Sequence, residues 1–166
     1  MEINKYINKE IVSFNKDLDI FLNKYKTDNK LFKVMCYSLR NGGKRLRPII
    51  IKEVSKSLNL KKRQYINSMI AIELIHSYSL IHDDLPCMDD DNIRRGKPST
   101  HIKFGESTAV LAGNSLLTLA FEILSSPNLK LNEKIKINLI KKLSECSGHL
   151  GIAGGQYLDL SYERKK

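Results

Sequence analysis

Apolar side chains over the first 25 residues recur with helical spacing. The steps between them are mostly three and four residues, and lysine and asparagine occupy the opposite face. The stripe consists of Ile3, Tyr6, Ile7, Ile11, Phe14, Leu18, Phe21 and Tyr25. It predicts one long amphipathic helix at the start of the chain.

Capping residues and glycines mark the limits of a second helix. Asp28 or Asn29 can cap a helix over about 30–40, because a side-chain oxygen accepts hydrogen bonds from the free N–H groups of the first turn. Gly42 and Gly43 end this helix, since glycine readily adopts left-handed backbone.

Prolines set the limits of the next two helices. Pro48 fits the first turn of a third helix, which runs to about residue 58. A fourth helix over about 63–84 is mostly apolar, which predicts a central and largely buried position. Pro86 ends or kinks this fourth helix.

The rest of the chain continues the helical pattern. We expect a polar loop at 89–101, a helix at 107–124, a helix at 132–147 and a glycine-rich helical stretch at 148–159. No segment alternates convincingly with the two-residue period of a strand, and no linker divides the chain. The sequence therefore predicts a single all-α domain over residues 1–166.

Composition and charge narrow the class of protein. The 166 residues are 42% hydrophobic and 28% charged, which is typical of a globular domain. The net charge of +10 suits an anionic partner, but it is spread over lysines on solvated helix faces. No compact basic strip is interleaved with aromatic residues, so we expect no nucleic-acid partner.

Targeting signals and cysteine usage favour a cytoplasmic protein. The chain has no run of 18 apolar residues, so no transmembrane segment is expected, and its first residues lack the apolar region of a secretory signal. Cys36, Cys87 and Cys146 are an odd, scattered set without CxxC spacing. We interpret them as reduced thiols in the cytoplasm.

Five aspartates fall within the nine residues 83–91, at the end of the apolar fourth helix. Like charges this close cost on the order of 1 kcal/mol or more each when partly buried, so a cation should lie among them. Carboxylates without histidine or cysteine at metal spacing favour Mg²⁺ over zinc. Arg94 and Arg95 follow, but adjacent side chains point apart, and guanidinium groups suit phosphate. The alternative is a solvated acidic turn with a local salt bridge.

A second candidate site is the segment GGKRLRP, residues 42–48. Three cations, Lys44, Arg45 and Arg47, follow a glycine pair and lead into a helix N-terminus, which favours anions. The alternative is an exposed basic turn. His76 lies seven residues before the aspartate cluster on the same helical face, although a lone histidine is more often a core residue.

These motifs together resemble the trans-isoprenyl diphosphate synthase family. GGKRLRP, HSYSLIHDDLPCMDDDNIRRGKPSTH and GGQYLDL are similar to motifs of the bacterial-type farnesyl and geranylgeranyl enzymes, whose first aspartate-rich motif is DDxxxxD. The resemblance covers nearly the whole chain from about Met35 onward. It implies the N-terminal half of an antiparallel helical bundle, the isoprenoid synthase fold, usually present as a homodimer.

The resemblance also implies roles for the cationic residues. Lys44, Arg47, His76 and Arg95 match positions that bind isopentenyl diphosphate, and Arg94 matches one that binds the allylic diphosphate. The implied reaction joins the two substrates after ionisation of the allylic diphosphate.

Acidic and chain-length positions carry over in the same way. Asp83 and Asp89 match the Mg²⁺ ligands of the first motif, with Asp84 close by. Tyr78 and Ser79, one turn before the motif, match the positions that limit product length, and a bulky tyrosine there implies farnesyl diphosphate. A geranylgeranyl or geranyl product is the alternative.

One departure leaves another reading open. The family has a second aspartate-rich motif, and the acids after Asp91 in this sequence do not pair. We therefore expect the 166-residue chain to be inactive alone, with helices such as 107–124 lacking partners over their apolar surface. A non-catalytic subunit that binds diphosphate or a partner chain is the alternative.

Overall fold

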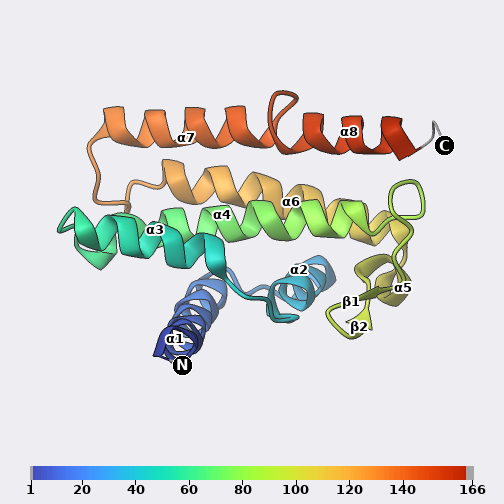
Figure 1. The fold of residues 1–166 in the computed structure, drawn as a ribbon, viewed down its shortest axis with the longest axis horizontal. Helices are drawn as coiled ribbons and strands as arrows, with labels where there is room; N and C mark the ends of the chain where they lie inside the picture. The colour runs from blue at the N-terminus through green and yellow to red at the C-terminus, as the bar shows by residue number, and fades with distance from the viewer. Residues whose placement is uncertain (1, 164–166) are drawn as a thin grey trace.

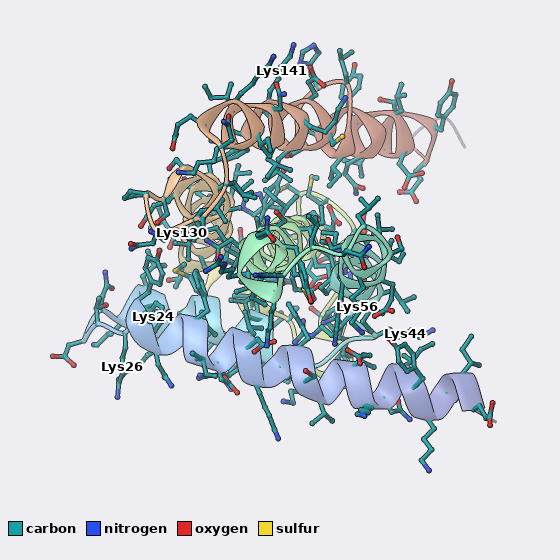
Figure 2. All side chains as sticks on the ribbon, turned by 90° about the vertical axis from the view of Figure 1, so that its left-hand side faces the viewer. Lys24, Lys26, Lys44, Lys56, Lys130 and Lys141 are labelled. Atoms are coloured by element: carbon teal, nitrogen blue, oxygen red, sulfur yellow. The ribbon has the colours of Figure 1, made fainter. Side chains whose placement is uncertain are left out.

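The computed structural model describes residues 2–163, which form a layered bundle of helices. The helices are α1 (Glu2–Lys24), α2 (Lys30–Arg40), α3 (Leu46–Ser57), α4 (Lys62–Asp83), α5 (Thr100–Phe104), α6 (Glu106–Ser125), α7 (Glu133–Ser147) and α8 (Ile152–Glu163). Figure 1 shows α3, α4 and α6 in a middle layer, with α7 and α8 along one side and α1 and α2 along the other. Figure 2, turned by 90°, shows the same order of layers. The predicted all-α bundle is confirmed.

The core forms around α4, as its apolar sequence predicts. Leu74 and Ile75 of α4 are almost completely buried and pack with apolar side chains from the other layers. Gly113 lets α6 approach α4 closely, because a Cβ atom at this position would overlap the ring of His82. The His82 Nε2 atom lies 3.2 Å from the carbonyl oxygen of Val110, so the ring fills the space beside the glycine.

Side-chain caps explain where two of the helices begin. The Oδ1 atom of Asn29 accepts a hydrogen bond of 2.8 Å from the N–H of Leu31, which identifies Asn29 as the cap of α2. Asn132 caps α7 in the same way. Pro48 lies in the first turn of α3, which starts two residues earlier, at Leu46.

The segment predicted to be a polar loop contains more structure than expected. Strands β1 (Ile93–Arg94) and β2 (Lys97–Pro98) form an antiparallel hairpin, and α5 starts at Thr100. Arg95 and Gly96 join the strands with φ angles of 55° and 75°, the left-handed pair of a two-residue hairpin turn. Strands of two residues are too short to show an alternating pattern, which is why the sequence did not reveal them.

The prediction that 107–124 lies uncovered was wrong. Helix α6 packs against α4, α2, α5 and α7, and its small and apolar residues are buried in the core. Within the described residues it is also the one helix long and apolar enough to cross a membrane, a criterion that soluble core helices also meet. The uncovered helix is instead α8, in which no residue is buried.

Candidate functional site

An open cavity of about 640 Å³ lies where the α2–α3 loop, α4 and the hairpin meet. It is lined by Asn41, Gly43, Lys44, Arg45, Leu46, Arg47, Glu73, His76 and Arg95. We call it the cationic cavity. The fold thus brings together Lys44, Arg47, His76 and Arg95, the four residues to which the family resemblance gave a role in binding isopentenyl diphosphate.

Arg45 anchors the wall of the cationic cavity. The Arg45 side chain is 2% exposed, and its guanidinium group forms an ion pair with the buried Glu73, donates to the Leu39 carbonyl oxygen and donates to Asn15 Oδ1 at 3.0 Å. Its backbone is left-handed, with φ of 48°. Lys44 and Arg47 on either side are exposed. Arg45 was grouped with them at the sequence level, whereas the structure gives it a supporting position.

Arg95 closes the opposite side of the cavity. Its guanidinium group donates to the carbonyl oxygen of Gly42. The φ of Gly43 is 126°, so the backbone favours glycine there, and the Arg95 guanidinium group lies close to the place of the missing Cβ atom. The glycine pair therefore serves to receive an arginine from the hairpin, 53 residues away.

His76 is held neutral at the bottom of this cationic set. Burial, and next the positive charge of Arg47, lower the pKa of the His76 imidazole, and Arg95 and Arg45 act in the same direction. Glu73 opposes this effect, but its carboxylate is already paired with Arg45. The cavity therefore carries an excess of positive charge that an anion would neutralise.

The two ends of the DDxxxxD motif meet beyond the end of α4. The N–H of Asp89 donates to the carbonyl oxygen of Asp83 at 2.9 Å, because the chain turns back at Leu85 and Pro86. Burial, followed by the charges of Asp89 and Asp84, raises the pKa of the Asp83 carboxyl to about 6. Within residues 2–163, the Asp83 side chain has no hydrogen bond or ion pair. The positive charge of Arg94 opposes the rise in this pKa, but Arg94 forms its direct contacts with Asp84 and Asp91 instead.

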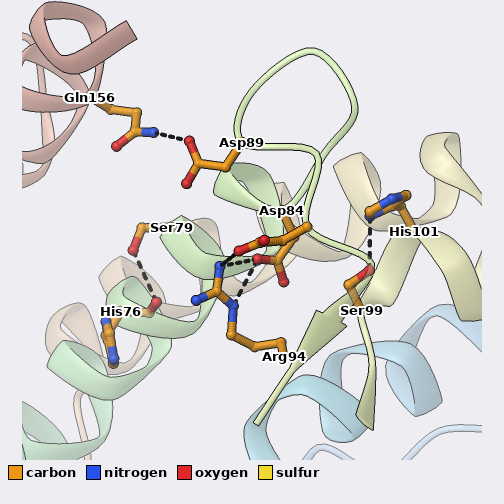
Figure 3. A network of polar contacts seen from close by, with 9 residues as sticks. His76, Ser79, Asp84, Asp89, Arg94, Ser99, His101 and Gln156 are labelled. Carbon is orange, nitrogen blue, oxygen red and sulfur yellow. Dashed lines mark hydrogen bonds and ion pairs between the residues drawn. The ribbon is translucent and has the colours of Figure 1, made fainter. Parts of the chain in front are cut away.

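Asp84 differs from Asp83 because it already has a cation. Its carboxylate is nearly buried and accepts a hydrogen bond of 2.8 Å from Arg94 Nε (Figure 3). Arg94 Nη2 also lies 2.9 Å from Asp91 Oδ2. Arg94 and Arg95 thus point apart as expected, one to the aspartates and one to Gly42. In the described part of the chain, no three acidic, histidine or cysteine side chains gather closely enough to hold a metal.

Two polar residues near this motif were not expected from the sequence. Gln156 of α8 donates to Asp89 Oδ1 at 3.1 Å, and Figure 3 shows this contact reaching across from the outer layer. His101 is buried, with Nδ1 lying 3.2 Å from Ser99 Oγ and Nε2 lacking a partner among the described residues. The signal for each was its place inside a quoted motif, Gln156 within GGQYLDL and His101 at the end of HSYSLIHDDLPCMDDDNIRRGKPSTH, but no role was assigned to either residue.

The predicted chain-length residues lie on α4 below Asp83. Tyr78 is half-buried, with its ring edge-on to His82 at a centroid distance of 5.4 Å. Burial, and next the charge of Asp83, raise the pKa of the Tyr78 phenol. The Ser79 hydroxyl is buried and donates to the His76 carbonyl oxygen at 3.0 Å (Figure 3). Of these two residues, Tyr78 is therefore the one whose side chain lies near Asp83.

Comparison with known protein families assigns the chain to one of them. Residues 28–166 match the family model described as polyprenyl synthetase. The chain belongs to the polyprenyl synthetase family. Its helical fold is that of the N-terminal portion of family members.

Individual relatives support this family assignment and show what share of their length this chain covers. The chain is 42% identical to farnesyl diphosphate synthase of Bacillus subtilis over 155 residues, which cover 93% of this chain and 52% of that protein. An FPP/GFPP synthase from Zymomonas mobilis has a TM-score of 0.90 at 38% identity and matches over 98% of this chain and 60% of its own. A geranyltransferase from Legionella pneumophila has a TM-score of 0.89 at 37% identity, covering 95% and 56%. This polyprenyl synthetase chain spans about half the length of the curated relatives it matches.

Proposed function

We propose that this chain supplies the diphosphate-binding wall of a prenyltransferase that condenses isopentenyl diphosphate with an allylic diphosphate, dimethylallyl or geranyl. The observation that carries the proposal is the cationic cavity, in which Lys44, Arg47 and Arg95 surround a neutral histidine. The volume suits a small molecule, and arginine side chains can grip phosphate oxygens with two parallel hydrogen bonds. Isopentenyl diphosphate is the substrate that we assign to it.

The aspartates after α4 and Arg94 form the second part of the proposed site. Asp83 and Asp89 fit Mg²⁺, because their carboxylates supply hard oxygen ligands and the charge of Asp83 lacks a counter-ion. Bound Mg²⁺ would supply positive charge to the departing diphosphate of the allylic substrate. Arg94, already oriented by Asp84, would contribute a guanidinium group to the same diphosphate.

Farnesyl diphosphate is the product that we propose. Tyr78 lies one turn before Asp83 on α4, where its half-buried ring can limit the room for a growing chain. The names of the relatives, farnesyl diphosphate synthase and FPP/GFPP synthase, support this choice.

Calorimetric titration with isopentenyl diphosphate tests the assignment of the cationic cavity. Arg47→Ala removes one charged hydrogen-bond donor, so we expect the affinity to fall by about tenfold or more. Arg63→Ala is the matched control, because Arg63 is an exposed arginine at the start of α4, outside the cavity lining. Equal affinities for the two variants would show that the diphosphate binds elsewhere.

A further inference from the structure

A second cavity, of about 510 Å³, lies between the end of α1, one face of α2, the hairpin and α5. It has no role in the proposed condensation. Its size falls in the range of small-molecule sites. Among the described residues, Asn41 is the one that lines both this cavity and the cationic cavity, so the two cavities are neighbours. We call it the α2 cavity.

Positive charge dominates the polar lining of the α2 cavity. Lys26, Lys33 and Lys97 line it and have no ion pair within residues 2–163. Figure 2 shows Lys26 at the end of α1. Arg40 also lines it and is partly neutralised by Asp19, at 2.9 Å. The lining contributed by the described residues contains no acidic side chain, so the charge of this cavity would attract an anion.

One side of the lining is apolar, and contacts with neighbouring residues hold its aromatic rings in place. Tyr37 and Phe104 pack edge to face at a centroid distance of 5.1 Å, and the Tyr37 hydroxyl donates to the Pro98 carbonyl oxygen at 2.7 Å. Lys103 Nζ lies 4.1 Å from the centre of the Tyr37 ring. Phe32 and the buried Cys36 complete the apolar side. A simple inorganic anion would leave this aromatic surface in water.

We propose that the α2 cavity binds a small organic phosphate with an apolar or aromatic body. Its phosphate group contacts Lys33 and Lys97, and its body packs on Phe32, Tyr37 and Phe104. An isoprenoid diphosphate and a nucleotide share this chemistry. The ligand also contacts Asn41, the C-cap of α2, next to the glycine whose carbonyl oxygen receives Arg95. Occupation of the α2 cavity therefore restrains the loop that forms the wall of the cationic cavity.

To measure binding at the α2 cavity alone, the test first removes two cations from the cationic cavity. In the 166-residue chain carrying Lys44→Ala and Arg47→Ala, without magnesium, binding of farnesyl diphosphate, ADP and inorganic diphosphate is measured by calorimetry. We expect at least one organic probe to bind at least about tenfold more tightly than inorganic diphosphate, because only the organic probes cover the aromatic wall. The probe that binds identifies the source of the ligand. Inorganic diphosphate binding as tightly as both organic probes would overturn the proposal.

Charge reversal locates the binding in the same background. Lys33→Glu with Lys97→Glu should weaken the organic probe by at least about tenfold, since two charged contacts are lost. Lys130→Glu with Lys134→Glu changes the net charge equally on an exposed, distant surface and should have little effect. Equal weakening by both pairs, or failure of both organic probes to bind below about 1 mM, would overturn the proposal. Circular dichroism verifies that each variant folds.

Discussion

Asp83 illustrates how a single partly buried carboxylate can lower the stability of the fold. Its pKa of about 6 lies above the ordinary value of 3.8, because burial and the neighbouring carboxylates disfavour the charged form. The folded protein therefore holds this proton to a higher pH than the unfolded chain. The free energy of unfolding should fall as the pH rises from about 4 to about 6.

We predict that Asp83→Asn stabilises the protein at pH 7 in the absence of magnesium. A shift of this size is discounted for partial exposure to solvent, which leaves an expected gain of about 1 kcal/mol. Urea denaturation at several pH values measures it, and the gain should vanish below about pH 4 because wild-type Asp83 is then also neutral. Asp159→Asn, at an exposed position on α8, is the control and should change little. A gain that persists at pH 3 would contradict the assignment to charge.

Tyr78 gives a prediction about product length. Replacing the ring by a methyl group should open space below Asp83, so Tyr78→Ala should shift the product beyond fifteen carbons. The measurement is product analysis in an active assembly that contains this chain. Ser79→Ala is the comparison, because the Ser79 hydroxyl is directed at the His76 carbonyl oxygen and should affect length less. An unchanged product in Tyr78→Ala would place the limit elsewhere.

At the scale of elements, the sequence predicted helix limits well where residues close in the chain determine them. The limits of α2 follow from the Asn29 cap and the glycine pair, and the structure has them at the predicted residues. Non-local contacts were out of reach. Nothing in the pattern distinguishes the buried Arg45 from the exposed Lys44 and Arg47, because its position depends on Glu73, 28 residues later.

The same limit applied to the candidate site as a whole. The family resemblance was sufficient to select Lys44, Arg47, His76 and Arg95, which do line one cavity. The contact of Gln156 with Asp89 joins segments 67 residues apart and could only be seen once the layers were in place.

The loop between α2 and α3 should depend on the ion pair of Arg45 and Glu73. Glu73→Leu leaves a buried guanidinium group without its carboxylate, so we expect a loss of about 3–5 kcal/mol in the free energy of unfolding. Adding Arg45→Met removes the unpaired charge and should recover part of that loss. Chemical denaturation of the two single variants and the double variant measures the coupling. Additive losses in the double variant would show that the pair does not act as a unit.

For the whole molecule, the exposed face of α8 should govern behaviour in solution. Tyr157 and Leu158 are 72% and 54% exposed, and no residue of α8 is buried. Apolar surface of this kind promotes association. We expect the 166-residue chain to self-associate, and Tyr157→Lys with Leu158→Lys to reduce its mass in analytical ultracentrifugation. The control is Ile3→Lys with Ile20→Lys on the exposed side of α1. An equal decrease in the control would assign the association to general apolarity.

The same exposed face bears on catalysis. A reacting allylic cation must be shielded from water, and α8 lies beside Asp89 with its outer surface uncovered. We therefore expect no coupling of isopentenyl and dimethylallyl diphosphates by the purified 166-residue chain. Product analysis after a long incubation with magnesium checks this, and sustained turnover by a monomer would show that this portion of the fold suffices.

The contact between Gly113 and His82 restricts the order in which mutations can accumulate. A helical glycine is normally improved by alanine, by about 0.5–1 kcal/mol. Here the imidazole ring occupies the place of the methyl group. We therefore expect Gly113→Ala alone to destabilise the protein and the same substitution to stabilise it once His82→Ala has removed the ring, as thermal denaturation of the variants would measure. One substitution thus changes sign according to the residue 31 positions away. Lineages that exchange this pair must pass first through position 82, and homologues with alanine at 113 should carry a small side chain there.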